Sequence, residues 1–249
     1  MTPAFSFWLT SLPGSRGRVT EMNQEQVRQM LRQTPLFGHL EDEALDHVVE
    51  CSETVRLAKG DSLYEEGDES DSVGLLLDGC MQVYVSESSG KKYVLQMVMP
   101  GQLLGMESFV DCGERGNNVV ADEDSVLLRF TRETLRQVFD SEDGLPDCDR
   151  VRCSIMRYLV SLVRHMTTLA RNLALLDVYG RVRILINQML IEQDGVLILR
   201  KQLTQQEIAD QIGSSREMVA RILKELVYGH YIRLENRRIV VLKMLPENF

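Results

Sequence analysis

The sequence lacks any stretch that would mark a membrane protein or a secreted one. Its longest apolar runs, residues 73–77 and 93–100, are far shorter than the roughly 18 to 20 residues that a membrane-spanning helix needs. Residues 4–12 are rich in aromatic side chains, but no basic segment precedes them and no A-x-A-like cleavage site follows. We therefore expect no transmembrane segment, no signal peptide and no membrane partner.

Paired cysteines and catalytic motifs are missing as well. The chain has five cysteines, an odd number without a C-x-x-C pair, which suggests neither a disulfide framework nor a zinc ribbon. This cysteine usage fits a reducing cytoplasm. No metal-ligand cluster, phosphate-binding loop or nucleophile–base spacing stands out, so we predict that the protein is not an enzyme.

The chain as a whole has no excess of basic residues, because its formal net charge is −9. Residues 1–170 carry 16 Lys and Arg against 28 Asp and Glu, whereas residues 171–249 carry 12 against 9. A length of 249 residues is enough for two domains of about 100 to 150 residues each. The asymmetry predicts an acidic N-terminal module and a basic C-terminal one with different partners.

The N-terminal half of the chain shows three successive sequence patterns. Residues 1–23 have no apolar period and are expected to be a disordered lead, with Met22 as an equally plausible translation start. Residues 24–48 show helical spacing broken by Pro35 and predict two short helices. From 53 to 130, alternating apolar stretches are separated by glycines every 11 or 12 residues, which favours an antiparallel roll of jelly-roll type over a generic β-domain.

A heptad pattern follows the predicted roll. Its apolar positions alternate steps of four and three and form a predicted dimer seam: Ile155, Leu159, Leu162, Met166, Leu169, Leu173 and Leu176. A second apolar flank, Val160, Val163, Ala170 and Ala174, would let one side cover the sheet while the other meets a partner helix. We predict a parallel homodimer.

The C-terminal segment has the pattern of a winged helix-turn-helix. A helix from 177 to about Ile191 precedes a hairpin through Asp194-Gly195. Thr204–Glu207 and Ser214–Glu217 are capping-box patterns that open two helices on either side of Gly213, and residues 231–242 form a second hairpin. The fold class is therefore predicted as α+β: an antiparallel β-roll, a long dimerisation helix and a winged helix.

The second of these helices carries residues suited to reading DNA. A helix fits the major groove of DNA, and residues near its N-terminus point at base edges. Arg216, Arg221 and Lys224 can share one outward face; arginine can bond guanine bidentately, and Glu217 can accept from cytosine. The alternatives are a solvated helix with ordinary ion pairs, or a ligand-binding module whose winged helix contacts protein only.

These residues resemble the CRP/FNR family of bacterial transcription regulators over almost the whole chain from about residue 25. The strongest segments are 203–226, LTQQEIADQIGSSREMVARILKEL, and 172–181, NLALLDVYGR. The resemblance implies that Arg216, Glu217 and Arg221 read bases in a TGTGA-like inverted repeat. It implies backbone contacts for Thr204, Gln205, Ser215 and Lys224, although Gln205 stands where relatives often have Arg.

The same resemblance places an effector pocket in the roll, with a departure from the cyclic-nucleotide pattern. The implied pocket residues are Gly105, Met106, Glu107, Ser108, Arg115, Gly116, Thr167 and Thr168. Arg115 matches the phosphate partner, but Met106 falls at the position of the ribose-binding Glu and Gly116 replaces a hydroxyl residue. A cyclic nucleotide is therefore a candidate effector, but ordinary cAMP binding is not expected, while cyclic di-GMP and constitutive DNA binding stay open.

The sequence also bears on other effectors and partners that members of the family use. An iron-sulfur cluster is not expected because residues 1–50 contain no cysteine, and haem would need an axial ligand such as His165. RNA polymerase is an expected partner, although the hairpin at 192–202 is shorter than the family's polymerase-contacting loop. The domain bounds we expect are 1–23 for the lead, 24–145 for the roll, 146–177 for the dimerisation helix and 178–249 for the DNA-binding domain.

Overall fold

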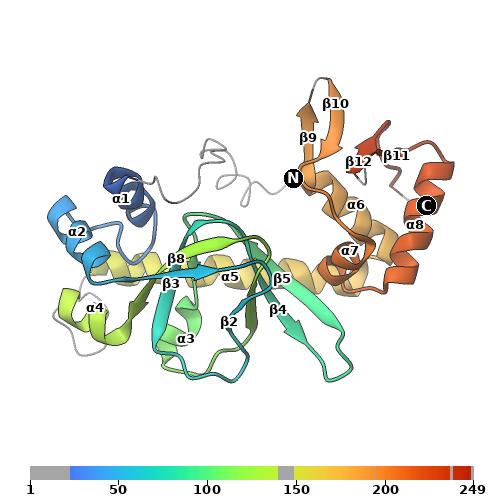
Figure 1. The fold of residues 1–249 in the computed structure, drawn as a ribbon. Helices are drawn as coiled ribbons and strands as arrows, with labels where there is room; N and C mark the ends of the chain where they lie inside the picture. The colour runs from blue at the N-terminus through green and yellow to red at the C-terminus, as the bar shows by residue number, and fades with distance from the viewer. Residues whose placement is uncertain (1–22, 140–148, 194, 236–237, 248–249) are drawn as a thin grey trace.

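The computed structural model describes residues 23–139, 149–193, 195–235 and 238–247. Residues 1–22, where we expect the disordered lead and the alternative start at Met22, lie outside the described residues. The roll, the helices at one end of it and the C-terminal domain at the other follow one another along a single long helix (Figure 1).

Two short helices open the described chain and confirm the prediction for residues 24–48. Helix α1 spans Gln24–Arg32 and α2 spans Asp42–Glu50. The Asn23 side chain accepts from the backbone N–H of Gln26, whose side chain accepts in return from the N–H of Asn23. Arg28 of α1 bonds Asp46 of α2 at 2.6 Å. With α4 (Arg132–Phe139), these helices cover one end of the roll.

The roll consists of two four-stranded antiparallel sheets, in the orders β1-β8-β3-β6 and β2-β7-β4-β5. Its strands are β1 (Glu53–Leu57), β2 (Ser62–Tyr64), β3 (Ser72–Asp78), β4 (Met81–Ser86), β5 (Lys92–Val98), β6 (Leu103–Leu104), β7 (Asn118–Ala121) and β8 (Ser125–Thr131). The predicted antiparallel roll is confirmed. At Gly79, between β3 and β4, φ is +91° and a Cβ would lie 2.3 Å from the Ser125 Oγ, so only glycine fits this turn.

A single long helix, α5 (Asp149–Leu175), links the roll to the C-terminal domain (Figure 1). Its N-terminal turns bury Val151 and Ile155 in the core that α1, α2 and the roll share. It is 27 residues long. Among the described residues, no helix is both long and apolar enough to cross a membrane.

The C-terminal domain packs three helices on a third antiparallel sheet, in the order β11-β12-β10-β9. Its elements are α6 (Val178–Met189), β9 (Leu190–Gln193), β10 (Val196–Leu199), α7 (Gln205–Ile212), α8 (Arg216–Tyr228), β11 (Ile232–Glu235) and β12 (Arg238–Val241). Helix α6 ends two residues before the predicted Ile191. Leu190 and Ile191 instead pair with Leu199 and Ile198 of β10, because a ladder satisfies backbone groups that a further helical turn would leave to solvent.

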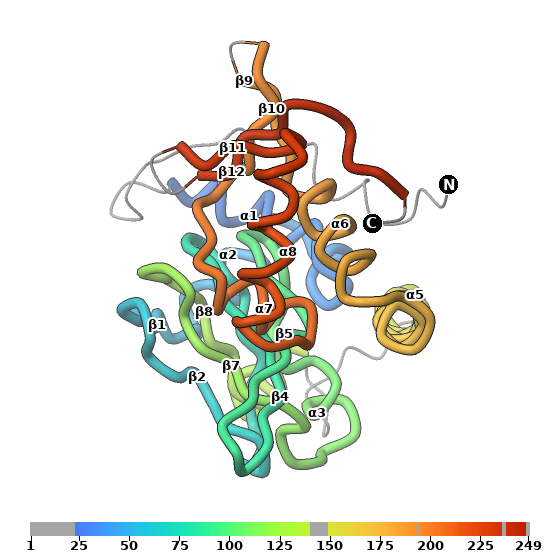
Figure 2. Tube along the Cα trace, turned by 90° about the vertical axis from the view of Figure 1, so that its right-hand side faces the viewer, coloured from blue at the N-terminus to red at the C-terminus, as the bar shows by residue number. Residues whose placement is uncertain are grey.

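The two halves of the molecule touch. In a view turned by 90°, helix α7 lies beside β5 of the roll (Figure 2), and residues of these two elements are in contact. The contact brings the C-terminal domain against the sheet that also carries β4 and β7.

Candidate functional site

Helix α8 has one buried face and one exposed face. Val219, Ile222, Leu223 and Leu226 anchor it in the core of the C-terminal domain. The opposite face carries Arg216, Glu217, Arg221 and Lys224, which are all exposed. Within the described part of the chain, no hydrogen bond or salt bridge engages these four side chains. Their charged groups are therefore free to meet a ligand outside the protein.

The turn before α8 differs in one detail from the sequence prediction. Ser215, not Ser214, caps the helix: its Oγ accepts from the backbone N–H of Met218 at 3.2 Å. The capping box expected between Ser214 and Glu217 does not form, because the helix begins one residue later. Glu217 consequently stays on the exposed face instead of bonding back to the cap.

Helix α7 begins with the capping box that the sequence predicts. The Thr204 Oγ1 accepts from the N–H of Glu207 at 3.1 Å, and the Glu207 carboxylate accepts from the N–H of Thr204 at 2.6 Å. Thr204 is exposed and Gln205 half-buried at this N-terminus. The helix ends at Gly213, whose φ of +64° is the left-handed conformation that glycine adopts freely.

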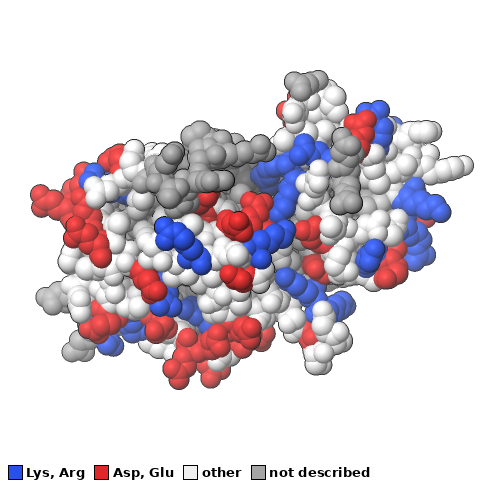
Figure 3. Space-filling view, in the orientation of Figure 1, with Lys and Arg blue, Asp and Glu red and all other residues white. Residues whose placement is uncertain are grey.

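Charge is distributed as the sequence predicts. Acidic side chains gather over α2 and along the lower edge of the roll, whereas lysines and arginines gather over α8 and between the roll and the C-terminal domain (Figure 3). A polyanion therefore meets attraction at the C-terminal domain and repulsion at the roll.

A cavity of about 170 Å³ lies between the roll and α5. Its polar walls are Tyr64, Gln96, Glu107, Asn117 and Tyr158, and its apolar walls include Leu95, Leu103, Leu162 and Met166. Burial raises the pKa of Tyr64 and of Tyr158, and the charge of Glu107 raises both further. Asn117 Nδ2 donates to Glu107 Oε1 at 3.4 Å, while its Oδ1 is buried without a partner in the described residues.

Arg115 does not line this cavity, and its two terminal nitrogens are bonded within the protein, whereas its Nε has no partner in the described residues. One terminal nitrogen donates to the Gly105 carbonyl oxygen at 3.2 Å and to Ser108 Oγ at 3.1 Å. The other donates to the Ser72 carbonyl oxygen at 2.8 Å, and the guanidinium stacks on Tyr64. Arg115 lines a second cavity, beside Asp68, Glu69 and Asp71. Among the described residues around the first cavity, Glu107 is the charged group and no cation faces it.

Gly105 and Glu107 line this cavity, but the other six predicted pocket residues, among them Ser108, Arg115 and Gly116, do not. Met106 is fully buried in the apolar core and does not face the cavity, because Gly105 with φ +74° starts α3 (Met106–Asp111) so that Glu107 faces the cavity instead. Thr167 and Thr168 are exposed, and their hydroxyls donate to the carbonyl oxygens of Val163 and Arg164 in the preceding turn. On α5, Leu162 and Met166 line the cavity instead of Thr167 and Thr168.

The predicted haem ligand His165 has its Nε2 engaged within the protein. Its Nε2 donates to the carbonyl oxygen of Leu95 on β5, 3.0 Å away. This bond ties α5 to the roll, which is a structural role.

The first four residues of the predicted dimer seam on α5 face the roll, whereas Leu173 is exposed. Ile155 and Leu159 pack into the core of the roll, and Leu162 and Met166 line the cavity. The exposed stripe begins one residue later in each heptad and keeps the alternating spacing: Cys153, Met156, Val160, Val163, Thr167, Ala170 and Ala174. Met156 and Val163 are each 64% exposed. We call these seven residues the outer stripe.

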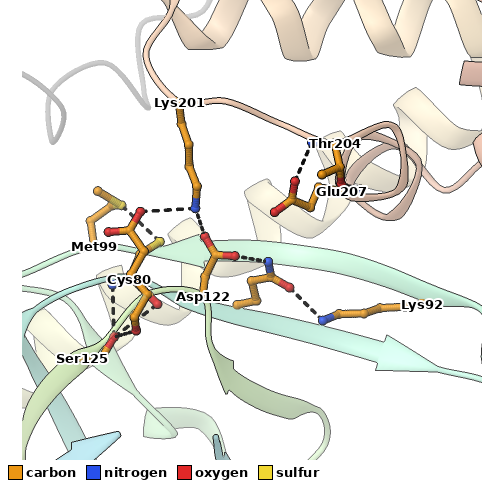
Figure 4. A network of polar contacts seen from close by, with 10 residues as sticks. Cys80, Lys92, Met99, Asp122, Ser125, Lys201, Thr204 and Glu207 are labelled. Carbon is orange, nitrogen blue, oxygen red and sulfur yellow. Dashed lines mark hydrogen bonds and ion pairs between the residues drawn. The ribbon is translucent and has the colours of Figure 1, made fainter. Parts of the chain in front are cut away.

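A contact between the two domains was not predicted. Lys201, three residues before Thr204, forms an ion pair with the buried Asp122 of the roll (Figure 4). The two residues are 79 positions apart, so no local pattern could pair them.

Comparison with known proteins agrees with this architecture. The family model of the cyclic nucleotide-binding domain matches residues 54–142, and that of the Crp-like helix-turn-helix domain matches residues 157–245. A CRP-like cAMP-activated global transcriptional regulator of Mycobacterium tuberculosis is 23% identical over 217 residues, covering 86% of this chain and 94% of that protein. The cyclic AMP receptor protein of Thermus thermophilus is 27% identical over 207 residues, covering 82% and 90%.

A solved structure shows the same fold. The c-di-GMP responsive global regulator CLP of Xanthomonas campestris superposes with a TM-score of 0.70 at 21% identity, covering 82% of this chain and all of that one. The matched domains and the fold define a regulator with a ligand-binding-type roll and a helix-turn-helix domain. The chain belongs to the CRP/FNR family of transcription regulators.

Proposed function

We propose that this protein is a homodimeric transcription regulator that reads a TGTGA-like inverted repeat with helix α8. The proposal depends on one observation: Arg216, Glu217 and Arg221, on the second helix of the helix-turn-helix, are exposed and have no partner in the described residues. Arg216 and Arg221 would donate to guanines and Glu217 would accept from a cytosine amino group. Thr204, Gln205, Ser215 and Lys224 would contact phosphates on either side. RNA polymerase stays a predicted partner.

The dimer would form through the outer stripe of α5. Seven positions at alternating steps of three and four residues are the pattern of a two-stranded seam, and small Thr and Ala side chains allow close approach near its C-terminal end. A two-fold dimer would present its two α8 helices about one DNA turn apart, near 34 Å.

The effector would occupy the cavity between the roll and α5, but its walls do not fit a cyclic nucleotide. A cyclic phosphate would face the Glu107 carboxylate and find no cation, because Arg115 is bound to Gly105, Ser108 and Ser72. Gly116 adds no hydroxyl donor. The buried Oδ1 of Asn117 and the Glu107 carboxylate call for hydrogen-bond donors on the ligand. We therefore expect neither cAMP nor cyclic di-GMP to be the effector of this cavity.

The test is fluorescence anisotropy on a labelled TGTGA-N6-TCACA duplex at two salt concentrations, with and without each nucleotide. Specific binding without a nucleotide, unchanged by cAMP or cyclic di-GMP, is the expected result. A thermal shift by either nucleotide would contradict the charge argument for the cavity.

Arginine replacements separate DNA reading from general attraction. Arg216→Glu or Arg221→Glu should abolish specific binding, since each bidentate contact is worth about 1–3 kcal/mol and reversal adds repulsion. Arg56→Glu makes the same charge change on exposed β1 of the roll and should bind as the native protein does. If the three variants bound the duplex alike, α8 would not be the reading element.

A further inference from the structure

The contact between the roll and the C-terminal domain centres on one buried carboxylate. Asp122 follows β7, and its side chain is 5% exposed. Its Oδ1 accepts from Gln82 Nε2 at 2.7 Å, and its Oδ2 accepts from the Lys201 ammonium. Lys201 Nζ also lies 3.3 Å from Glu123 Oε1. The ion pair thus joins the roll to the segment that leads into α7.

The network continues along β4 and β5. Lys92 Nζ donates to Gln82 Oε1 at 2.8 Å and stacks on Tyr84. Burial lowers the pKa of Lys92, and the charges of Asp210 on α7 and of Asp122 act in the opposite direction. Burial lowers the pKa of Lys201, but the hydrogen bonds and charges of Asp122 and Glu123 together outweigh it and raise the pKa, so the ammonium stays charged at neutral pH.

A second, apolar anchor lies at the turn of the helix-turn-helix. A Cβ on Gly213 would stand 3.2 Å from Leu173 Cδ2 and 3.3 Å from the Tyr93 ring, so α5 and β5 both touch this turn. Arg181 of α6 donates to the carbonyl oxygen of Ile212 at 2.8 Å, which fixes the end of α7. The turn that precedes the reading helix is therefore held between the roll, α5 and α6.

This contact leaves the reading face open. Arg216, Glu217 and Arg221 are exposed while α7 is docked on β5. A contact that orients α8 without covering it can set the direction in which the helix projects from the dimer axis.

We propose that the Asp122–Lys201 pair is a positioning latch, which holds the C-terminal domain on the roll in the orientation that binds DNA. The inference rests on the proposed DNA-reading function of α8. Lys201 acts through the orientation of α7 and α8, not through a phosphate contact of its own.

The experiment compares five variants with the native full-length protein. Asp122→Asn and Lys201→Gln each remove one charge of the latch, and the double variant removes both. Lys201→Arg keeps the charge and should retain the DNA affinity of the native protein. Lys59→Gln is the matched control, because Lys59 is an exposed roll lysine whose backbone N–H bonds the neighbouring Asp124 at 2.9 Å.

Specific DNA affinity should fall on the order of tenfold in each single variant, a usual size for coupling between domains. The double variant should be no weaker than either single one, because both changes open the same latch. The slope of log affinity against log salt should stay constant, whereas loss of a phosphate contact would reduce it by about 0.9. Lys201→Arg and Lys59→Gln should bind within about twofold of the native protein.

Small-angle scattering supplies a readout that does not need DNA. The single latch variants should show a larger radius of gyration with unchanged thermal unfolding of the roll. Unchanged radius and affinity would overturn the latch. Tighter DNA binding by Asp122→Asn would overturn it too, because the pair would then restrain Lys201 or the domain instead of positioning it. Failure of the native protein to bind any duplex would refute the proposed function. The scattering comparison would still show whether the Asp122–Lys201 pair holds the two domains together.

Discussion

The outer stripe of α5 makes a quantitative prediction about dimerisation. Val163 lies in the middle of the stripe and is 64% exposed, so about two thirds of its side chain remains to be buried by a partner. Full burial of a valine is worth about 1.5–3 kcal/mol, which leaves about 1–2 kcal/mol per protomer and about twice that per dimer. Val163→Glu loses this term and places two carboxylates opposite each other in an apolar seam. Each of them costs at least about 1 kcal/mol to desolvate.

Together these terms reach about 4 kcal/mol per dimer, which corresponds to a dimer dissociation constant about a thousandfold higher. Sedimentation velocity over a concentration series measures the change directly. Thr168→Glu is the matched control, since Thr168 is exposed on the same helix but outside the outer stripe. The phase of the seam would be refuted if Val163→Glu dimerised like the native protein, or if Thr168→Glu dissociated and Val163→Glu did not.

Three further results are expected. Mild oxidation should cross-link two protomers through Cys153, the first residue of the outer stripe, and Cys153→Ser should abolish the dimer band on a non-reducing gel although the exposed Cys112 remains. Burial raises the pKa of Cys80 to about 12, so at pH 8 mass spectrometry should find iodoacetamide on Cys112 and Cys153 before Cys80; equal labelling would contradict its burial. Burial lowers the pKa of His39, whose ring stacks on Phe139, so this residue contributes stability above its ordinary pKa of 6.5 that is lost as pH falls below it. In urea unfolding, His39→Phe should therefore flatten the loss of stability between about pH 7 and 5, and an unchanged slope would argue against this role.

The sequence predicted the elements of the C-terminal domain because its signals are local. A threonine followed by a glutamate three residues later forms the cap of α7 as expected, and Gly213 supplies the left-handed turn. These interactions join neighbours in the chain and need no tertiary context. The same local pattern at Ser214 was misplaced by one residue, since Ser215 could cap equally well.

The phase of α5 could not be decided from its pattern. Two apolar stripes run along the helix one residue apart, and both keep heptad spacing. The stripe with the larger side chains, including Leu159 and Leu162, covers the roll, where more apolar surface is available to bury. The smaller valine, threonine and alanine side chains are left outside. Periodicity fixes the spacing of a stripe but not which body it faces.

The cavity between the roll and α5 includes Gly105 and Glu107 from the predicted effector pocket, but most of the predicted residues do not line it. Both Met106 and Glu107 were predicted as pocket residues. The positive φ of Gly105, which spacing does not reveal, places Glu107 at the cavity and Met106 in the core. Tyr64 and Tyr158 reach the cavity from β2 and α5, which lie far apart in the sequence. Whether Arg115 faces the cavity or its own loop is likewise a question of three-dimensional hydrogen bonding.

The geometry of α5 links the cavity to the reading helix through few contacts. Leu162 and Met166 line the cavity, and their neighbours Val163 and Thr167 belong to the outer stripe. If the outer stripe forms the proposed dimer seam, a ligand that shifts or rotates these turns changes that seam at the same level of the helix. Two turns further on, Leu173 touches the site of Gly213, directly before α8. An effector can favour one arrangement only if it binds that arrangement more tightly, so the residues that decide the response are those whose cavity contacts change with the phase of α5.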